Sequence, residues 1–270
     1  MTELAGKVAI VTGGGTGIGK GIALRFARAG MKLALAGLEH APSADNQYGS
    51  TRIGGYSTAQ AVAAEIGGDA IAIEADVADE AAVDAMFART LERFGRVDVV
   101  VNAAGSIVTH PIAEISAAEW DSIMDVNARG TFLVNKAAVI RMRAQGGGGR
   151  IINVASIAGR AGYPNIAHYC ASKFAVVGFT AALAKEVARE DITVNCICPG
   201  IVGTQMWTHL SEARLEPGET RDQAFSRIVE GFIPQGVPQT ADDMAALALY
   251  LAEAPHVTGQ AINVDGGVLL

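Results

Sequence analysis

The chain has 270 residues, half of them apolar and 18% charged, which is too apolar for an intrinsically disordered protein. A formal net charge of −7 disfavours a general nucleic-acid or anionic-membrane surface, because both partners are themselves negative. No apolar stretch approaches the roughly 18 residues of a membrane-spanning helix, and the N-terminus does not have the pattern of a signal peptide. The three cysteines are typical of reduced intracellular thiols. These features predict a soluble cytoplasmic protein.

Short apolar runs alternate with helical patterns along the chain. Seven runs predict strands buried on both faces: Lys7–Thr12, Leu33–Ala36, Ala70–Ala75, Val97–Val101, Ile151–Ala155, Ile192–Ile197 and Ala261–Val264. A helix is predicted after the first run, with its stop at Gly30, and further helices lie between most of the others, at Ala59–Ile66, Glu80–Phe94, Ala117–Ala144, Tyr169–Arg189 and Ala241–Leu251. This alternation predicts the α/β class: a single domain over residues 1–270, with a Rossmann-type, doubly wound, seven-stranded parallel sheet covered by helices on both faces.

Two segments interrupt the alternation. Residues 38–56 are rich in Gly, Ser, Asn and Pro and predict a long loop insertion after the second strand. Residues 204–238 are irregular and partly helical, and we interpret them as the region that covers a substrate. Two helix starts are predicted from capping residues, Ser116 with Glu119 and Thr240 with Asp243.

Small, polar or turn-forming residues follow the predicted strands at the edge where an open parallel sheet binds its ligands. In the first of these segments, Gly13 permits a tight turn, Gly17 allows backbone to approach a pyrophosphate, and Gly19 lets the helix pack on the strand. The N-terminus of that helix offers N–H groups to phosphates. Glycine-rich turns are also common structural devices, but this strand–turn–helix context favours a dinucleotide site.

Tyr169 and Lys173 are four residues apart on a predicted helix, so their side chains share one face. An ammonium beside a phenol stabilises the phenolate and lowers the phenol pKa from about 10 toward neutrality. An isolated pair of this kind is more often an ordinary surface pair. Asn127 lies on an apolar helical stripe, where a buried amide needs hydrogen-bond partners; a satisfied core residue and a functional role both fit.

Six motifs occur in an order that resembles the short-chain dehydrogenase/reductase family over almost the whole chain: Thr12-Gly-Gly-Gly-Thr-Gly-Ile-Gly19, Asn102-Ala-Ala-Gly105, Asn127, Ser156, Tyr169-x-x-x-Lys173 and Pro199-Gly200. The resemblance implies that Tyr169 is the acid/base and that Ser156 orients the reacting oxygen. Lys173 would bind the nicotinamide ribose and lower the pKa of the tyrosine, and Asn127 would hold a water of the proton relay. Ala103 replaces the second Asn of the usual Asn-Asn-Ala-Gly, which removes no proposed catalytic group.

The resemblance also implies a homotetramer and a set of cofactor contacts. The predicted cofactor-binding residues are Gly13, Thr16, Gly17, Ile18, Gly19, Glu39, Asp76, Val77, Asn102, Ala103, Ala104, Gly105, Tyr169, Lys173, Pro199, Gly200, Val202 and Thr204.

The tip of the second strand predicts NAD as the cofactor. Family members that use NADP often carry a basic residue where Leu38 or Thr16 stands, and Glu39 would repel a 2′-phosphate. We therefore predict NAD(H), with Glu39 either a ribose ligand or a solvated loop carboxylate. NADP would be favoured if the loop folded back to supply Lys32, His40 or Arg52.

Residues 198–207 resemble a segment of acetoin/butanediol reductases and polyol dehydrogenases. The predicted substrate contacts are Ser156, Ile157, Tyr169, Met206 and Trp207, with His110 a further polar candidate; loop packing explains the Met and Trp equally well. No metal is predicted, because Cys196 and Cys198 have no partners at ligand spacing and fit core thiols.

These motifs predict an oxidoreductase that transfers a hydride between NAD(H) and a small secondary alcohol or ketone, such as a vicinal diol, acyloin or polyol. The alternatives are a 3-oxoacyl-type NADP ketoreductase and a non-catalytic dinucleotide-binding sensor. A sensor would not need an acidified tyrosine.

Overall fold

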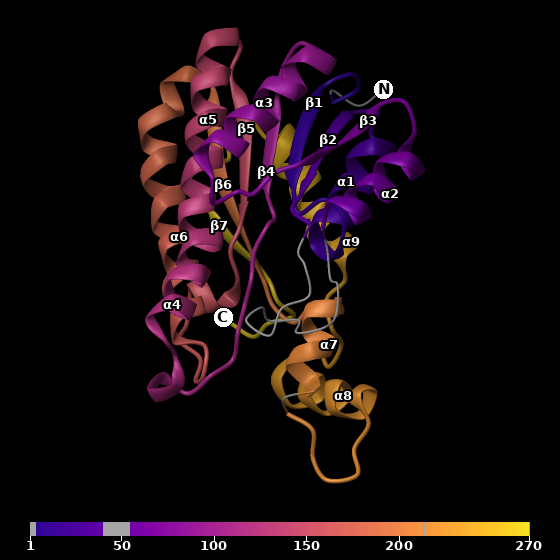
Figure 1. Cartoon of the computed structure of the whole chain (residues 1–270), viewed down its shortest axis with the longest axis vertical. Coiled ribbons are helices and arrows are strands. Elements are labelled where there is room, and N and C mark those ends of the chain that lie inside the picture. The colour runs from indigo at the N-terminus through magenta and orange to yellow at the C-terminus, as the bar shows by residue number, and fades with distance from the viewer. Residues whose placement is uncertain (1–3, 40–54, 213, 270) are drawn as a thin grey trace.

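The computed structural model describes residues 4–39, 55–212 and 214–269 (Figure 1). Its seven strands form one parallel sheet in the order β3-β2-β1-β4-β5-β6-β7. Their bounds are β1 Val8–Thr12, β2 Lys32–Gly37, β3 Ala70–Glu74, β4 Val99–Asn102, β5 Gly149–Val154, β6 Ile192–Pro199 and β7 Ala261–Val264. The predicted fold class and all seven predicted strands are confirmed.

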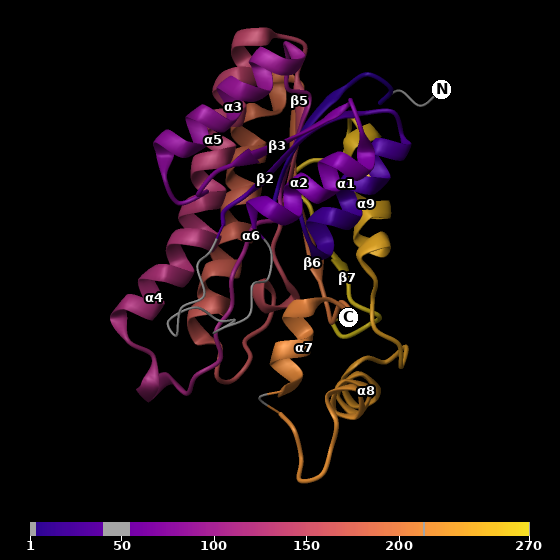
Figure 2. The same cartoon turned by 45° about the vertical axis from the view of Figure 1, so that its right-hand side comes forward.

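Helices cover both faces of the sheet, because strand side chains alternate between two buried layers. Val11 of β1 packs with α1 (Gly17–Arg28), α2 (Tyr56–Ile66) and α9 (Ala241–Glu253). Its neighbour Ile10 packs with α3 (Glu80–Phe94), α5 (Gly130–Gln145) and α6 (Ala167–Val187) on the opposite face. Beyond the carboxyl edge of the sheet lie α7 (Gln205–Glu212) and α8 (Arg221–Phe232), as Figure 2 shows. The predicted partly helical character of residues 204–238 is therefore confirmed.

The helix predicted over Ala117–Ala144 is not continuous. A π-helical turn at Asp125–Arg129 separates α4 (Ala117–Met124) from α5. The apolar spacing on either side conceals this turn, because both flanks keep the ordinary helical period. Asn127 lies inside the turn, and π-helical turns are frequent at functional sites.

The segment predicted as a loop, residues 38–56, overlaps α2 by one residue, because that helix begins at Tyr56. Residues 40–54 of that prediction lie outside the described part of the chain, and with them His40 and Arg52.

The two predicted helix caps have different outcomes. Thr240 and Asp243 form a complete capping box at the start of α9. At α4, the Glu119 N–H donates to Ser116 Oγ at 3.1 Å, but the Glu119 carboxylate lies beside His110 Nδ1, at 2.9 Å, and His168 Nε2, at 3.2 Å. The carboxylate therefore pairs with two imidazoles instead of completing a capping box.

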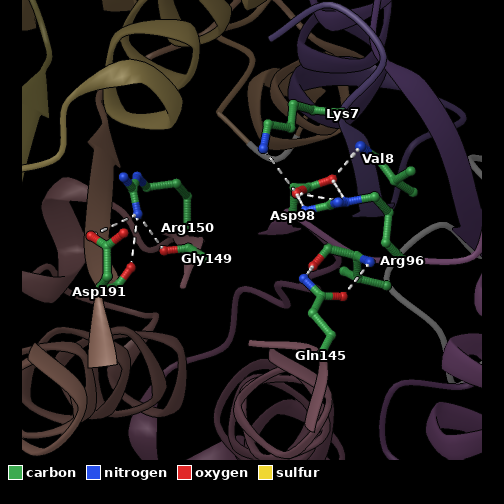
Figure 3. Close-up of polar contacts among 9 residues, drawn as sticks. Lys7, Val8, Arg96, Asp98, Gln145, Gly149, Arg150 and Asp191 are labelled. Atoms are coloured by element: carbon green, nitrogen blue, oxygen red, sulfur yellow. Dashed lines mark hydrogen bonds and ion pairs between the residues drawn. The ribbon is translucent and has the colours of Figure 1, made fainter. Parts of the chain in front are cut away.

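The buried carboxylate of Asp98 links β1 to β4 at the amino edge of the sheet (Figure 3). Asp98, directly before β4, accepts hydrogen bonds from the Val8 N–H at 2.9 Å and from Arg96 Nε at 2.8 Å, and Lys7 Nζ lies 3.4 Å away. Burial alone would raise the pKa of the Asp98 carboxyl, but these hydrogen bonds and positive charges together hold it below its usual value. The contacts join β1 to β4 at the edge opposite the predicted ligand site.

An Asp98→Asn variant should lose about 1–3 kcal/mol of unfolding free energy, because an NH₂ donor would replace an acceptor oxygen facing other donors. The pKa of Asp98 is depressed in the folded state, so its stabilisation is present above the unfolded-state pKa and is lost as pH falls through the folded-state value. Urea denaturation should therefore show the variant's deficit at about pH 7 and much less of it near pH 3. Asp191→Asn, at an exposed carboxylate of the same edge, should change little. An equal deficit at both pH values would contradict the ionic role of Asp98.

Candidate active site

The carboxyl ends of the central strands surround a cavity of about 360 Å³. One side is formed by residues that follow β4, β5 and β6, including Gly105, Ser156 and Gly200, and the other by residues of α7 and α8. The site lies where the order of the sheet reverses, since β1 pairs with both β2 and β4. This reversal is where open α/β sheets bind ligands.

Tyr169 and Lys173 line this cavity from one face of α6. Lys173 is 5% exposed, its Nζ donates to the Val154 carbonyl at 3.1 Å, and it lies 5.5 Å from the centroid of the Tyr169 ring. Burial lowers the pKa of Lys173 to about 8, so the amine is still mostly protonated at neutral pH. An ammonium has three donors, and this one has capacity for further acceptors in the cavity.

Ser156 enters the same cavity from the end of β5. Its Oγ accepts a hydrogen bond from the Ala158 N–H at 3.1 Å and caps the short 3₁₀ helix Ile157–Gly159. That bond uses a lone pair of the oxygen, so the hydroxyl proton can still be donated. Ser156 can thus orient an oxygen atom held between itself and Tyr169.

Asn127 lies beneath the cavity and does not line it. Its side chain is 1% exposed and donates to the Ser106 carbonyl at 2.8 Å and to Ser172 Oγ at 3.0 Å, while its Oδ1 accepts from the Ser106 N–H at 2.9 Å. A Cβ added to Gly105 would lie 3.2 Å from Asn127 Oδ1 and 3.4 Å from Lys173 Nζ. The amide is satisfied as a core residue would be, and its predicted role in a proton relay stays a prediction.

The turn between β1 and α1 has the features that a dinucleotide requires. Gly13 and Gly17 have φ of +65° and +49°, and a Cβ on Gly19 would lie 2.2 Å from the Gly13 carbonyl oxygen. The first turn of α1 contains no acidic residue, and the Thr16 side chain makes no capping hydrogen bond. The N–H groups at this helix end therefore lack side-chain acceptors and fit phosphate oxygens. With the buried ammonium of Lys173, the residues present fit a nicotinamide dinucleotide.

The other predicted cofactor residues form two groups. Seven line the cavity: Ile18, Ala103, Gly105, Pro199, Gly200, Val202 and Thr204. The rest lie outside it. There, Asp76 Oδ1 accepts from the Ala78 N–H at 2.9 Å, Val77 packs against Gly130, and Asn102 and Ala104 lie at the end of β4. Glu39 accepts from the Ser57 N–H at 2.9 Å, at the start of α2. The predicted contacts thus run along the edge of the sheet from the cavity toward β2.

A buried polar network beneath the cavity was not predicted. Asn153 Oδ1 accepts from Asn102 Nδ2 at 2.8 Å and from Asn135 Nδ2 at 2.9 Å, and Asn153 Nδ2 donates to Thr180 Oγ1 at 2.9 Å. This network ties the ends of β4 and β5 to α5 and α6. An amide inside the apolar run of β5 was the available signal, because a buried amide must find partners.

All five predicted substrate contacts line the cavity, but His110 does not: its ring pairs with Glu119. Twelve further lining residues were not predicted, among them Tyr163, Arg214, Ile228 and Phe232. Tyr163 and Phe232 pack edge to face with ring centroids 5.9 Å apart. Ile228 and Phe232 belong to α8, which was not predicted as a helix because the apolar periodicity of its sequence is weak.

Within residues 4–39, 55–212 and 214–269, no helix is long and apolar enough to cross a membrane. Over the same part of the chain, no group of three or more His, Cys, Asp or Glu side chains could hold a metal ion. Cys196 and Cys198 are fully buried on β6, as core thiols.

Comparison with known proteins gives consistent matches. A family model described as short chain dehydrogenase matches residues 7–215. A 3-oxoacyl-[acyl-carrier-protein] reductase of Synechocystis sp. is 37% identical over the full length of both chains, and a sorbitol dehydrogenase of Cereibacter sphaeroides is 35% identical over 98% of each. The crystal structure of a point variant of the actinorhodin polyketide ketoreductase with NADPH superposes with a TM-score of 0.86 at 34% identity, covering 97% of each chain.

Proposed function

Because the chain belongs to the short-chain dehydrogenase family of oxidoreductases, we propose that it transfers a hydride between NAD(H) and a secondary alcohol or ketone. One observation carries the proposal: Tyr169 and Lys173 from α6, and Ser156 just after β5, line the same cavity, next to the glycine turn that follows β1. A phenol, an ammonium and a hydroxyl donor in one enclosed site form an acid/base set suited to an alcohol.

In the oxidative direction, the Tyr169 phenolate takes the proton of the substrate hydroxyl. Ser156 Oγ donates a hydrogen bond to the same substrate oxygen and fixes its position. The Lys173 ammonium stabilises the phenolate electrostatically and binds hydroxyl oxygens of the dinucleotide. The bound nicotinamide supplies the hydride acceptor in this direction and the donor in reverse. In reduction, the Tyr169 hydroxyl returns the proton to the carbonyl oxygen.

Asn127 is proposed to act through its neighbours. Its hydrogen bonds to Ser106 and Ser172 hold the segment around Gly105 beside Lys173. We propose that a water bound there exchanges protons with the ammonium. A role in the relay would place this water at the base of the cavity.

We expect NADH to be used with a kcat/KM at least about 10-fold above that for NADPH, because a 2′-phosphate near Glu39 would meet a carboxylate. Neither Thr16 nor Leu38 supplies a compensating charge. Initial rates with both cofactors at one ketone concentration measure the ratio. A Glu39→Gln variant should lower the ratio of kcat/KM for NADH to kcat/KM for NADPH. The melting temperature of this variant must also be measured, because Glu39 accepts a hydrogen bond from the Ser57 N–H at the start of α2. A clear preference of the wild type for NADPH would overturn the NAD assignment.

A panel of ketones and alcohols, followed by the absorbance of the reduced nicotinamide, tests the proposed function. The names of two relatives, sorbitol dehydrogenase and galactitol 2-dehydrogenase, support including polyols. The names of 3-oxoacyl-[acyl-carrier-protein] reductases support the alternative of a 3-oxoacyl ketoreductase, for which thioesters belong in the panel. Cofactor binding without hydride transfer to any member would instead indicate a sensor.

The predicted homotetramer is supported by exposed apolar side chains on two long helices. Phe132 and Ile140 of α5 and Phe174 of α6 are each more than two-fifths exposed, and Phe132 packs edge to face with Phe179. Apolar helix faces of this kind are typical of subunit contacts.

A further inference from the structure

The cavity differs in chemistry between its reacting end and its outer part. At the reacting end lie Ser156, Tyr169 and Lys173. The outer part, formed by α7 and α8, has apolar and aromatic side chains: Met206, Trp207, Leu210, Ile228 and Phe232. A hydroxyl group placed against such a surface gives up hydrogen bonds to water and finds few replacements.

The outer part also contains a guanidinium. Arg214 lines the cavity with its guanidinium carbon 5.9 Å from the centroid of the Trp207 ring. Its other contact is a long 3.5 Å hydrogen bond from Nη1 to the Leu210 carbonyl. Arg214 is an exposed residue at the rim of the cavity, and partial burial of its guanidinium lowers its pKa.

Arg227, in the same region, has carboxylate partners, whereas Arg214 has none among the described residues. Arg227 Nε and Nη2 donate to the two oxygens of the Glu219 carboxylate, each at 2.8 Å, and Glu216 lies 3.4 Å away. Arg227 also donates to the backbone carbonyl of Arg214 at 2.9 Å and so holds that residue in place. No described carboxylate pairs with Arg214, and the described lining of the cavity contains two cations and no acid.

We propose that Arg214 is a specificity-determining residue that binds an anionic group at the far end of the substrate. The substrate class is then a ketone, or its alcohol, with an apolar body and a terminal carboxylate or phosphate. The reacting carbonyl lies at Ser156 and Tyr169, the body packs against the aromatic wall, and the anion meets the guanidinium. This inference rests on the proposed function and narrows it, because a polyol would leave both the apolar wall and Arg214 unused.

The guanidinium of Arg214 is held by the Trp207 ring and one long hydrogen bond, so most of its five N–H donors are available to a ligand. A carboxylate or phosphate would accept charge-assisted, bidentate hydrogen bonds from these donors. The interaction should therefore appear mainly in KM and much less in kcat, because Arg214 has no part in the proposed proton transfer.

The test uses pairs of ketones that differ only in the terminal group: benzoylbutyrate against benzoylbutyramide for a carboxylate, and an acetoacetyl thioester of phosphopantetheine against that of pantetheine for a phosphate. In the wild type, the KM of at least one anionic member should be about 10- to 100-fold below that of its neutral partner. Arg214→Gln should abolish the difference without changing the KM of the neutral ketone, and Arg214→Lys should restore part of it. Arg189→Gln removes the same charge from an exposed site outside the cavity lining and should leave the difference intact.

Several results would overturn the inference. They are equal KM values for both members of both pairs, an Arg214→Gln variant that weakens neutral and anionic ketones alike, or one that weakens the dinucleotide instead. Faster turnover of sorbitol than of every ketone in the pairs would also overturn it. If no ketone or alcohol is turned over, the proposed function fails, and calorimetric binding of benzoylbutyrate and its amide to wild type and Arg214→Gln still decides whether Arg214 selects an anion.

Discussion

A Tyr169→Phe variant should lose about 10²- to 10⁴-fold of kcat and still bind the dinucleotide with nearly wild-type affinity. The substitution removes one oxygen, the group that would exchange the proton with the substrate. The ring itself packs in a small cluster with Ile107, Ala158 and Ile166, which a phenylalanine preserves, so the fold should be retained. Steady-state rates give kcat, and the fluorescence of the bound reduced nicotinamide gives the affinity.

The cavity supplies a matched control for this prediction. Tyr163 also lines it but lies in the aromatic wall beside Phe232, so Tyr163→Phe removes a phenolic oxygen from the same site. Its kcat should change by only a few fold, since it has no part in the proposed proton transfer. Wild-type turnover by Tyr169→Phe, or an equal loss in the two variants, would show that Tyr169 is not the acid/base.

The fold could be predicted almost completely because its signals are local. Each central strand is a short apolar run followed by glycine or another small residue, and each crossover needs a helix long enough to return along the sheet. What escaped prediction depends on contacts between distant segments. Glu119 has the spacing of a capping residue, but His110 and His168 approach its carboxylate from other parts of the chain.

The location of the candidate site could be predicted because most of its residues lie at the carboxyl edge of the sheet. Ser156 follows a strand end, and Tyr169 and Lys173 share a helix face, which places them near this edge, but their catalytic roles came from the resemblance to the short-chain dehydrogenase/reductase family. The π-helical turn around Asn127 and the register of α8 could not be predicted, since neither changes the apolar period that a sequence displays. Arg214 was also missed, because its proposed role depends on the conformation of the segment between α7 and α8, which has no regular apolar period.

A Gly19→Ala variant should lose about 100-fold in dinucleotide affinity, or in kcat/KM for the dinucleotide, because the turn proposed to bind the phosphates cannot keep its geometry. The added Cβ would lie 2.2 Å from the Gly13 carbonyl oxygen and 2.7 Å from its carbon, both backbone atoms of the turn itself. Either α1 must move away from β1 or the turn must shift. Overpacking of this kind should also cost about 1–3 kcal/mol of unfolding free energy. Fluorescence titration measures the first effect and thermal denaturation the second.

Gly231→Ala is the matched control, since it makes the same change in α8 at a position where the added Cβ meets nothing within 4 Å. A helical alanine is more stable than glycine by about 0.5–1 kcal/mol, so this variant should melt no lower than the wild type and bind the dinucleotide normally. The contrast separates a general effect of adding a methyl group from a specific effect at the turn. If the Gly19→Ala variant bound the dinucleotide as tightly as the Gly231→Ala variant, dinucleotide binding would not depend on the close packing of α1 on the turn.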